Sequence, residues 1–155
     1  MFLDADMLVL CDIWELMEAS VAPAPDCPVS VVQNPALRFE WPSMMLFNNA
    51  LCRKLTPEWI DNEMNQPQAL GWSKPIGALP AEYNHCIGYD KPREDAKICH
   101  FTQGIPLFAE TKDSEYADLY RQELNMCRAT VGWEQIMGNS VHAEVVRARL
   151  SKVSN

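Results

Sequence analysis

The chain has 155 residues, enough for one domain with a hydrophobic core. Its 21 acidic and 13 basic side chains give a net charge of −8, and an acidic surface repels polyphosphate, which argues against sequence-independent nucleic-acid binding. Apolar residues make up 48% of the chain and charged residues 22%, and no apolar run is long enough for a bilayer, so the composition predicts a globular chain without a membrane span.

The cysteines predict a reducing environment. No pair has the Cys-x-x-Cys spacing of a zinc site, and the sequence shows no basic and then apolar leader before a small-residue cleavage site. We therefore expect reduced, mostly buried thiols and a cytoplasmic protein. The six positions are Cys11, Cys27, Cys52, Cys86, Cys99 and Cys127.

The first half of the chain predicts strands and short helices. The apolar residues 1–10 have the pattern of a buried central strand, and an acidic cap at Asp12 predicts a helix to about residue 19. Residues 29–33 and 43–47 read as strands, the second apolar enough to be buried. Thr56 followed by Pro57 predicts the start of another helix.

The second half is predicted to be richer in helix. Prolines and glycines interrupt residues 65–80, which we expect to be a loop, and residues 97–101 read as a short strand. A helix is predicted from Asp113 to Arg128, and a weaker one over residues 140–150. The overall expectation is a mixed α and β chain.

Asp4 and Asp6 form the first group that could carry chemistry. On an extended segment, residues i and i+2 project to the same side, about 6.6 Å apart along the backbone. Two carboxylates there would repel each other unless a cation lay between them, and Mg²⁺ or Mn²⁺ prefers carboxylate oxygens. Taken alone, an Asp-x-Asp pair is more often a matter of chance or of helix capping.

His100 is the second candidate. It ends a short apolar strand, and its imidazole could complete a Mn²⁺ site begun by two carboxylates. The turn that follows contains Gly104, and such turns often carry ligand residues, so we include Gly104 among the cofactor-binding candidates. The alternative for a single histidine is a half-buried ring bonded to a backbone carbonyl.

Two asparagines are the third group. Asn48 follows the predicted strand over residues 43–47, and Asn84 ends the segment Leu-Pro-Ala-Glu-Tyr-Asn over residues 79–84. Amide groups at a strand end suit sugar hydroxyls. The alternatives are an ordinary turn at Asn48 and an edge segment with Tyr83 packed inward.

In this order, four segments resemble the second half of nucleotide-sugar glycosyltransferases of the GT-A fold, of the glycogenin and lipopolysaccharide-galactosyltransferase kind. The similarity is greater still to a group of uncharacterised bacterial glycosyltransferases. The segments are Phe-Leu-Asp-Ala-Asp-Met-Leu-Val over residues 2–9, Trp-Pro-Ser-Met-Met-Leu-Phe-Asn over 41–48, Leu-Pro-Ala-Glu-Tyr-Asn over 79–84 and Lys-Ile-Cys-His-Phe-Thr over 97–102. The resemblance covers residues 2–120.

This resemblance implies specific roles. Asp4, Asp6 and His100 would hold Mn²⁺ or Mg²⁺ against the diphosphate of a nucleoside-diphosphate-sugar donor. The segment over residues 41–48 would contribute to the donor-sugar and acceptor pocket, with Asn48 and Asn84 orienting sugar hydroxyls. The acceptor would be a carbohydrate or another molecule with a hydroxyl.

The chain also departs from the family pattern. The Rossmann-like half that binds base and ribose normally precedes the Asp-x-Asp segment, so we expect a fragment or a late start codon. The basic residue expected after the last histidine is absent from residues 105–108. We expect residues 1–130 to form the metal and acceptor part, residues 131–155 to form a helical tail, and self-association to be possible at a truncated sheet edge.

Two other functions remain open at this point. One is an inactive truncated remnant or interaction module of the same fold. The other is a phosphatase using Asp-x-Asp as nucleophile and acid, although those enzymes usually place Gly-Thr after the second aspartate, where this chain has Met7 and Leu8.

Overall fold

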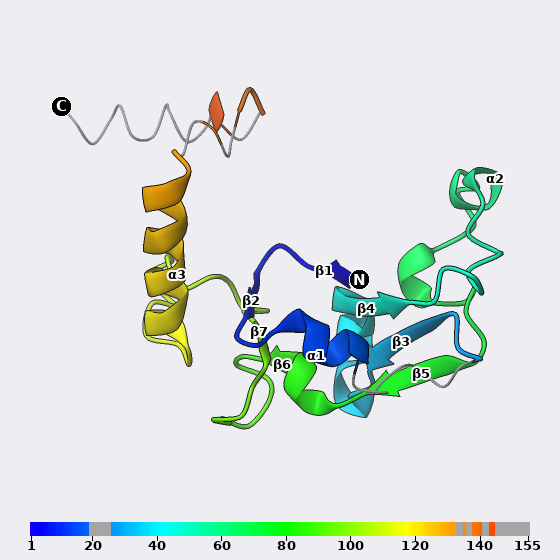
Figure 1. Ribbon diagram of the computed structural model, residues 1–155, viewed down its shortest axis with the longest axis horizontal. Coiled ribbons are helices and arrows are strands. Elements are labelled where there is room, and N and C mark those ends of the chain that lie inside the picture. The colour runs from blue at the N-terminus through cyan, green and yellow to red at the C-terminus, as the bar shows by residue number, and fades with distance from the viewer. Residues whose placement is uncertain (19–25, 133–134, 136–137, 141–142, 145–155) are drawn as a thin grey trace. The chain divides into compact units, whose positions relative to one another are not determined.

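The computed structural model describes residues 1–18, 26–132, 135, 138–140 and 143–144 (Figure 1). The chain divides into two compact units, Met1–Glu115 and Tyr116–Asn155. The boundary predicted after residue 130 falls at the end of the helix α3, inside the second unit, and stays a prediction. None of the described helices is both long and apolar enough to cross a membrane.

The first unit contains two small mixed sheets, which bears out the mixed α and β class. The larger sheet has the order β1-β4-β3-β5, in which β1 and β3 are antiparallel to β4 and β5 is parallel to β3 (Figure 1). The smaller sheet has the order β2-β7-β6, with β2 antiparallel and β6 parallel to β7. The strands are β1 (Phe2–Leu3), β2 (Met7–Val9), β3 (Val29–Val32), β4 (Met44–Phe47), β5 (Ile76–Leu79), β6 (His85–Cys86) and β7 (Ile98–His100).

Short helices connect these strands. Asp12 Oδ1 accepts a hydrogen bond from the Trp14 amide at the start of α1, and Thr56 Oγ1 does the same for the Trp59 amide in α2, as the capping residues predict. The helices of the first unit are α1 (Ile13–Glu18) and α2 (Pro57–Ile60), with the 3-10 helices η1 (Pro35–Ser43), η2 (Pro67–Ala69) and η3 (Ala81–Tyr83).

The two faces of β4 serve different clusters. Met44 and Leu46 are buried with Leu16 of α1 and Ile98 of β7, in a core that contains residues of both sheets. Met45 and Phe47 alternate with them and pack instead against the cluster that contains Trp72.

The N-terminal strand prediction is wrong. Residues 1–10 form two short strands rather than one, with a turn at residues 5–6, and the two strands lie at the edges of different sheets. The apolar pattern predicted burial correctly only for Leu8, whereas Phe2 is 43% exposed. The turn allows the chain to leave the larger sheet and enter the smaller one, which a single strand could not do.

The loop predicted over residues 65–80 contains β5 and η2. The strand was missed because Gly77 and the nearby prolines weaken every local strand signal. Gly77 is required by the pairing itself, because a Cβ there would overlap Ser30 Oγ on the parallel neighbour β3. Tyr83 is buried, as the alternative interpretation of residues 79–84 has it, but it lies in the 3-10 helix η3.

In the second unit the described helix is α3 (Ala117–Thr130), which begins later than predicted. Tyr116 has a φ of 59°, a left-handed conformation that interrupts the helix, so residues 113–115 lie outside it. The helix predicted over residues 140–150 falls largely outside the described residues.

Candidate metal centre

The turn between β1 and β2 carries Asp4 and Asp6. The Asp4 amide donates to the Ser43 carbonyl at 2.9 Å and so extends the pairing of β1 with β4. The Phe101 amide donates to the Asp6 carbonyl at 3.0 Å and extends the pairing of β2 with β7. Each aspartate is therefore fixed to a different sheet, and the extended geometry expected for the pair is replaced by a turn.

His100 lies next to this turn. Met7 pairs with His100 in the ladder between β2 and β7, which places the imidazole beside the residue that precedes Met7. The side chain of His100 is only 3% exposed, and its Nε2 lies 3.3 Å from Asp6 Oδ1. One ligand atom each of Asp4, Asp6 and His100 lies within 4.8 Å of the others, so the structure brings together the three residues expected to bind a metal ion.

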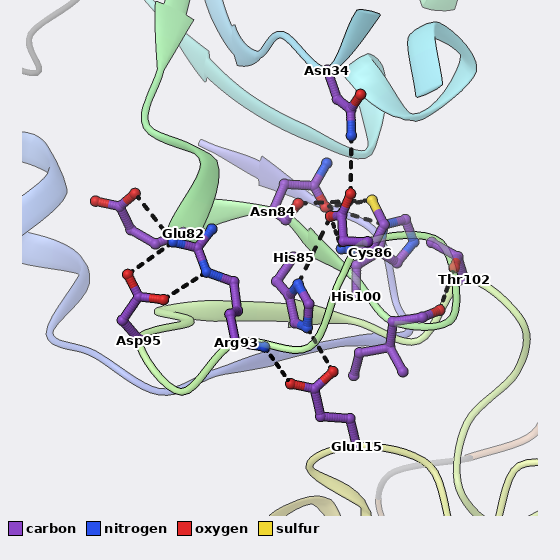
Figure 2. Close-up of polar contacts among 12 residues, drawn as sticks. Asn34, Glu82, Asn84, His85, Cys86, Arg93, Asp95, His100, Thr102 and Glu115 are labelled. Carbon is purple, nitrogen blue, oxygen red and sulfur yellow. Dashed lines mark hydrogen bonds and ion pairs between the residues drawn. The ribbon is translucent and has the colours of Figure 1, made fainter. Parts of the chain in front are cut away.

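Polar groups hold the other side of the imidazole (Figure 2). His100 Nδ1 lies 3.2 Å from Asn84 Oδ1, and Asn84 Nδ2 donates to the Glu40 carbonyl at 3.2 Å. The Glu40 carboxylate lies 3.7 Å from His100 Nδ1 and accepts a hydrogen bond from Ser43 Oγ at 2.7 Å. The backbone-carbonyl alternative for His100 is thus replaced by a side-chain partner.

This arrangement fits a divalent cation chemically. Because the Asn84 oxygen is an acceptor, Nδ1 is the ring nitrogen that donates to it, and Nε2 faces the Asp6 carboxylate. An unprotonated Nε2 in this position would be able to bind a metal ion together with the Asp6 carboxylate. Two carboxylates and an imidazole suit Mn²⁺, and metal-binding histidines typically donate a hydrogen bond from their other ring nitrogen, as His100 does to Asn84.

Asn84 therefore has a visible structural task. It is 4% exposed, and its amide oxygen and nitrogen already contact His100 and Glu40. The role of Asn84 in orienting sugar hydroxyls stays a prediction. The observed contacts show that Asn84 holds the imidazole of His100 in its orientation.

Asn48 and Gly104 lie away from this group. Asn48 follows the end of β4 opposite to Ser43, and its carbonyl accepts a hydrogen bond from the Leu51 amide in a turn. Gly104 has a φ of 117°, which favours glycine, and lines a cavity of about 220 Å³ that none of the three clustered residues lines. The structure does not bring either residue to the candidate centre.

A second polar cluster, centred on His85, was missed by the sequence analysis (Figure 2). His85 is fully buried in β6, with Nε2 2.9 Å from Glu115 Oε2 and Nδ1 3.8 Å from Asp90 Oδ2. The Arg93 amide donates to the other oxygen of Glu115. The partners lie 5 to 30 residues away in loops, and no local pattern marks them.

The thiol beside this cluster is chemically unreactive. Cys86 is 2% exposed, and its amide donates to Asp90 Oδ2 at 2.8 Å. Burial, together with the nearby carboxylates of Asp90 and Glu40, raises the pKa of the Cys86 thiol to about 12. None of the cysteines, which all lie in the described part of the chain, forms a disulfide.

Comparisons with known proteins give limited information. No protein-family model matches the chain, and no solved structure matches it. The chain is 29% identical over 147 aligned residues to "Protein CDI" of Arabidopsis thaliana, in a match that covers 80% of this chain and 57% of that protein. The chain thus spans a little over half the length of this relative.

Proposed function

We propose that the chain is the metal and acceptor part of a glycosyltransferase with a GT-A-like fold. The protein would transfer a sugar from a nucleoside diphosphate to an acceptor hydroxyl. The observation that carries the proposal is the convergence of Asp4, Asp6 and His100. His100 is 94 residues from Asp6 in the sequence, so their closeness is a product of the fold and not of local sequence. The order of the four resembling segments supports it.

Each residue of the candidate centre has a definite task in this proposal. Asp4 and Asp6 supply carboxylate oxygens, and His100 supplies Nε2 while Asn84 holds Nδ1. Mn²⁺ or Mg²⁺ bound there would offset the charge that develops on the departing diphosphate. The carboxylate of Asp6 is 38% exposed, so the centre remains accessible from solvent.

The experiment is a titration of the chain with Mn²⁺, followed by electron paramagnetic resonance, with and without UDP or GDP. We expect one bound Mn²⁺ per chain and tighter binding in the presence of a nucleoside diphosphate. Asp6→Asn should weaken Mn²⁺ binding at least about tenfold, because it removes an anionic ligand. Asp61→Asn, which changes an exposed aspartate at the end of α2, is the matched control.

The outcomes separate the proposal from its alternatives. Equal Mn²⁺ affinity of wild type and Asp6→Asn would show that the metal assignment is wrong. A second candidate is an inactive remnant or interaction module of the same fold, which would have no need of a nucleoside diphosphate. Mn²⁺ binding that does not respond to any nucleoside diphosphate would support that candidate.

A further inference from the structure

A cavity of about 510 Å³ lies beside Asp4, a volume typical of small-molecule sites. It is lined by Met45 and Phe47, the β4 residues that alternate with Met44 and Leu46 of the shared core. The cavity therefore lies on the second face of the larger sheet. Asp4 belongs to both the cavity wall and the candidate metal centre.

The polar groups of this cavity are gathered at one end. Asp4, Glu40 and Ser43 lie together there, because the Asp4 amide donates to the Ser43 carbonyl and Ser43 Oγ donates to Glu40. Phe47 lies at the other end of β4, about 13 Å along the chain from Ser43. At Phe47 the wall is aromatic, since the rings of Phe47 and Trp72 are parallel within 3°, with their centroids 5.9 Å apart.

The remaining lining residues are almost all apolar. Phe39 lines the cavity and is 62% exposed, so its ring is available to a ligand. Among the described residues that line the cavity, Gln68 is the one polar side chain outside the group of Asp4, Glu40 and Ser43. A cavity lined by several apolar and aromatic side chains, with a few polar groups, is typical of a small-molecule site.

We infer that this cavity binds the acceptor, and that the acceptor is an alcohol with an apolar body whose hydroxyl points toward Asp4 and Glu40. This inference rests on the proposed function and narrows its acceptor class. A sugar carries a hydroxyl on nearly every carbon, and each one buried without a partner costs free energy. The walls beyond the polar end satisfy few such groups, whereas they favour a hydrocarbon ring.

The test compares two probes with the same number of carbons and a six-membered ring. Cyclohexylmethanol has one hydroxyl, and methyl α-D-glucopyranoside has four. Saturation-transfer NMR titrations of the metal-free chain should give at least about tenfold tighter binding of cyclohexylmethanol. Phe39→Ser should weaken that binding about three- to tenfold, because it removes an aromatic wall.

Trp14→Ser is the matched control. Trp14 is also 62% exposed but lies on α1 and does not line this cavity, so its replacement should leave the affinity unchanged. Equal or tighter binding of the glucopyranoside would overturn the inference. If Phe39→Ser lowered the affinity for cyclohexylmethanol no more than Trp14→Ser does, the inference would be wrong. It would also be wrong if neither probe bound because two copies of the chain covered the cavity.

Failure here differs from failure of the proposed function, because these titrations contain no metal. Mn²⁺ binding without a preference for cyclohexylmethanol would overturn this inference alone. A preference for cyclohexylmethanol without Mn²⁺ binding would overturn the proposed transferase and leave the cavity an apolar alcohol site.

Discussion

Replacing Asn84 by alanine tests how the candidate centre is held together. The change removes the acceptor for His100 Nδ1 and the donor to the Glu40 carbonyl, and at 4% exposure water does not easily replace either. A buried group left without its partner costs about 1 to 3 kcal/mol, so two such groups lower the free energy of unfolding by about 2 to 6 kcal/mol. Loss of the hydrogen bond that orients a metal-binding histidine weakens metal affinity about 10- to 100-fold.

Urea unfolding followed by tryptophan fluorescence measures the first quantity, and Mn²⁺ titration by electron paramagnetic resonance measures the second. Asn48→Ala is the matched control, because Asn48 lies at the other end of β4 and none of the hydrogen bonds around His100 involves it. Both its stability and its Mn²⁺ affinity should stay close to wild type. An Asn84→Ala variant as stable as Asn48→Ala, with undiminished Mn²⁺ affinity, would refute the assignment of Asn84 to His100.

Two further predictions concern packing and a buried thiol. Gly77→Ala should destabilise the chain by about 1 to 3 kcal/mol in urea unfolding, because the new methyl group overlaps Ser30 Oγ. Gly71→Ala, at a position with open space around it, should change stability by less than about 0.5 kcal/mol. Equal effects of the two substitutions would contradict the close approach of β3 and β5. Burial raises the pKa of Cys86 from its usual 9.0 to about 12, so iodoacetamide at about pH 8 should label exposed Cys127 and not Cys86, as peptide mass spectrometry would show. Because the Cys86 thiol ionises near pH 9 in the unfolded chain and near 12 in the folded one, the free energy of unfolding should fall between these pH values, and Cys86→Ala should reduce that fall; an unchanged slope would contradict the pKa shift.

The sequence predicts the helices whose first turn is capped by a neighbouring side chain. The caps at Asp12 and Thr56 were read correctly, because an N-cap bonds an amide only two or three residues away. The strands β3, β4 and β7 were also predicted, since their apolar side chains are consecutive or alternate. Short-range physics is sufficient for these elements.

The missed strands depend on partners that are distant in the sequence. Both β5 and β6 pair in parallel, β5 with β3 and β6 with β7, and a parallel partner is never supplied by an adjacent hairpin. Gly77 also removes the side chain that would have marked β5 as a strand. For the same reason the cluster around His85 could not be found, because its partners come from separate loops.

For the candidate centre, the sequence alone indicates the ligand types: two carboxylates with one residue between them, and a histidine at the end of an apolar strand. Their meeting depends on a turn at residues 5–6 and on the register that pairs Met7 with His100, neither of which follows from local propensity. The tertiary structure also turned Asn84 toward the imidazole and left Asn48 at the opposite strand end. Ligand types are a property of the sequence, whereas distances between them arise only when sheet pairing and core packing bring remote segments of the chain together.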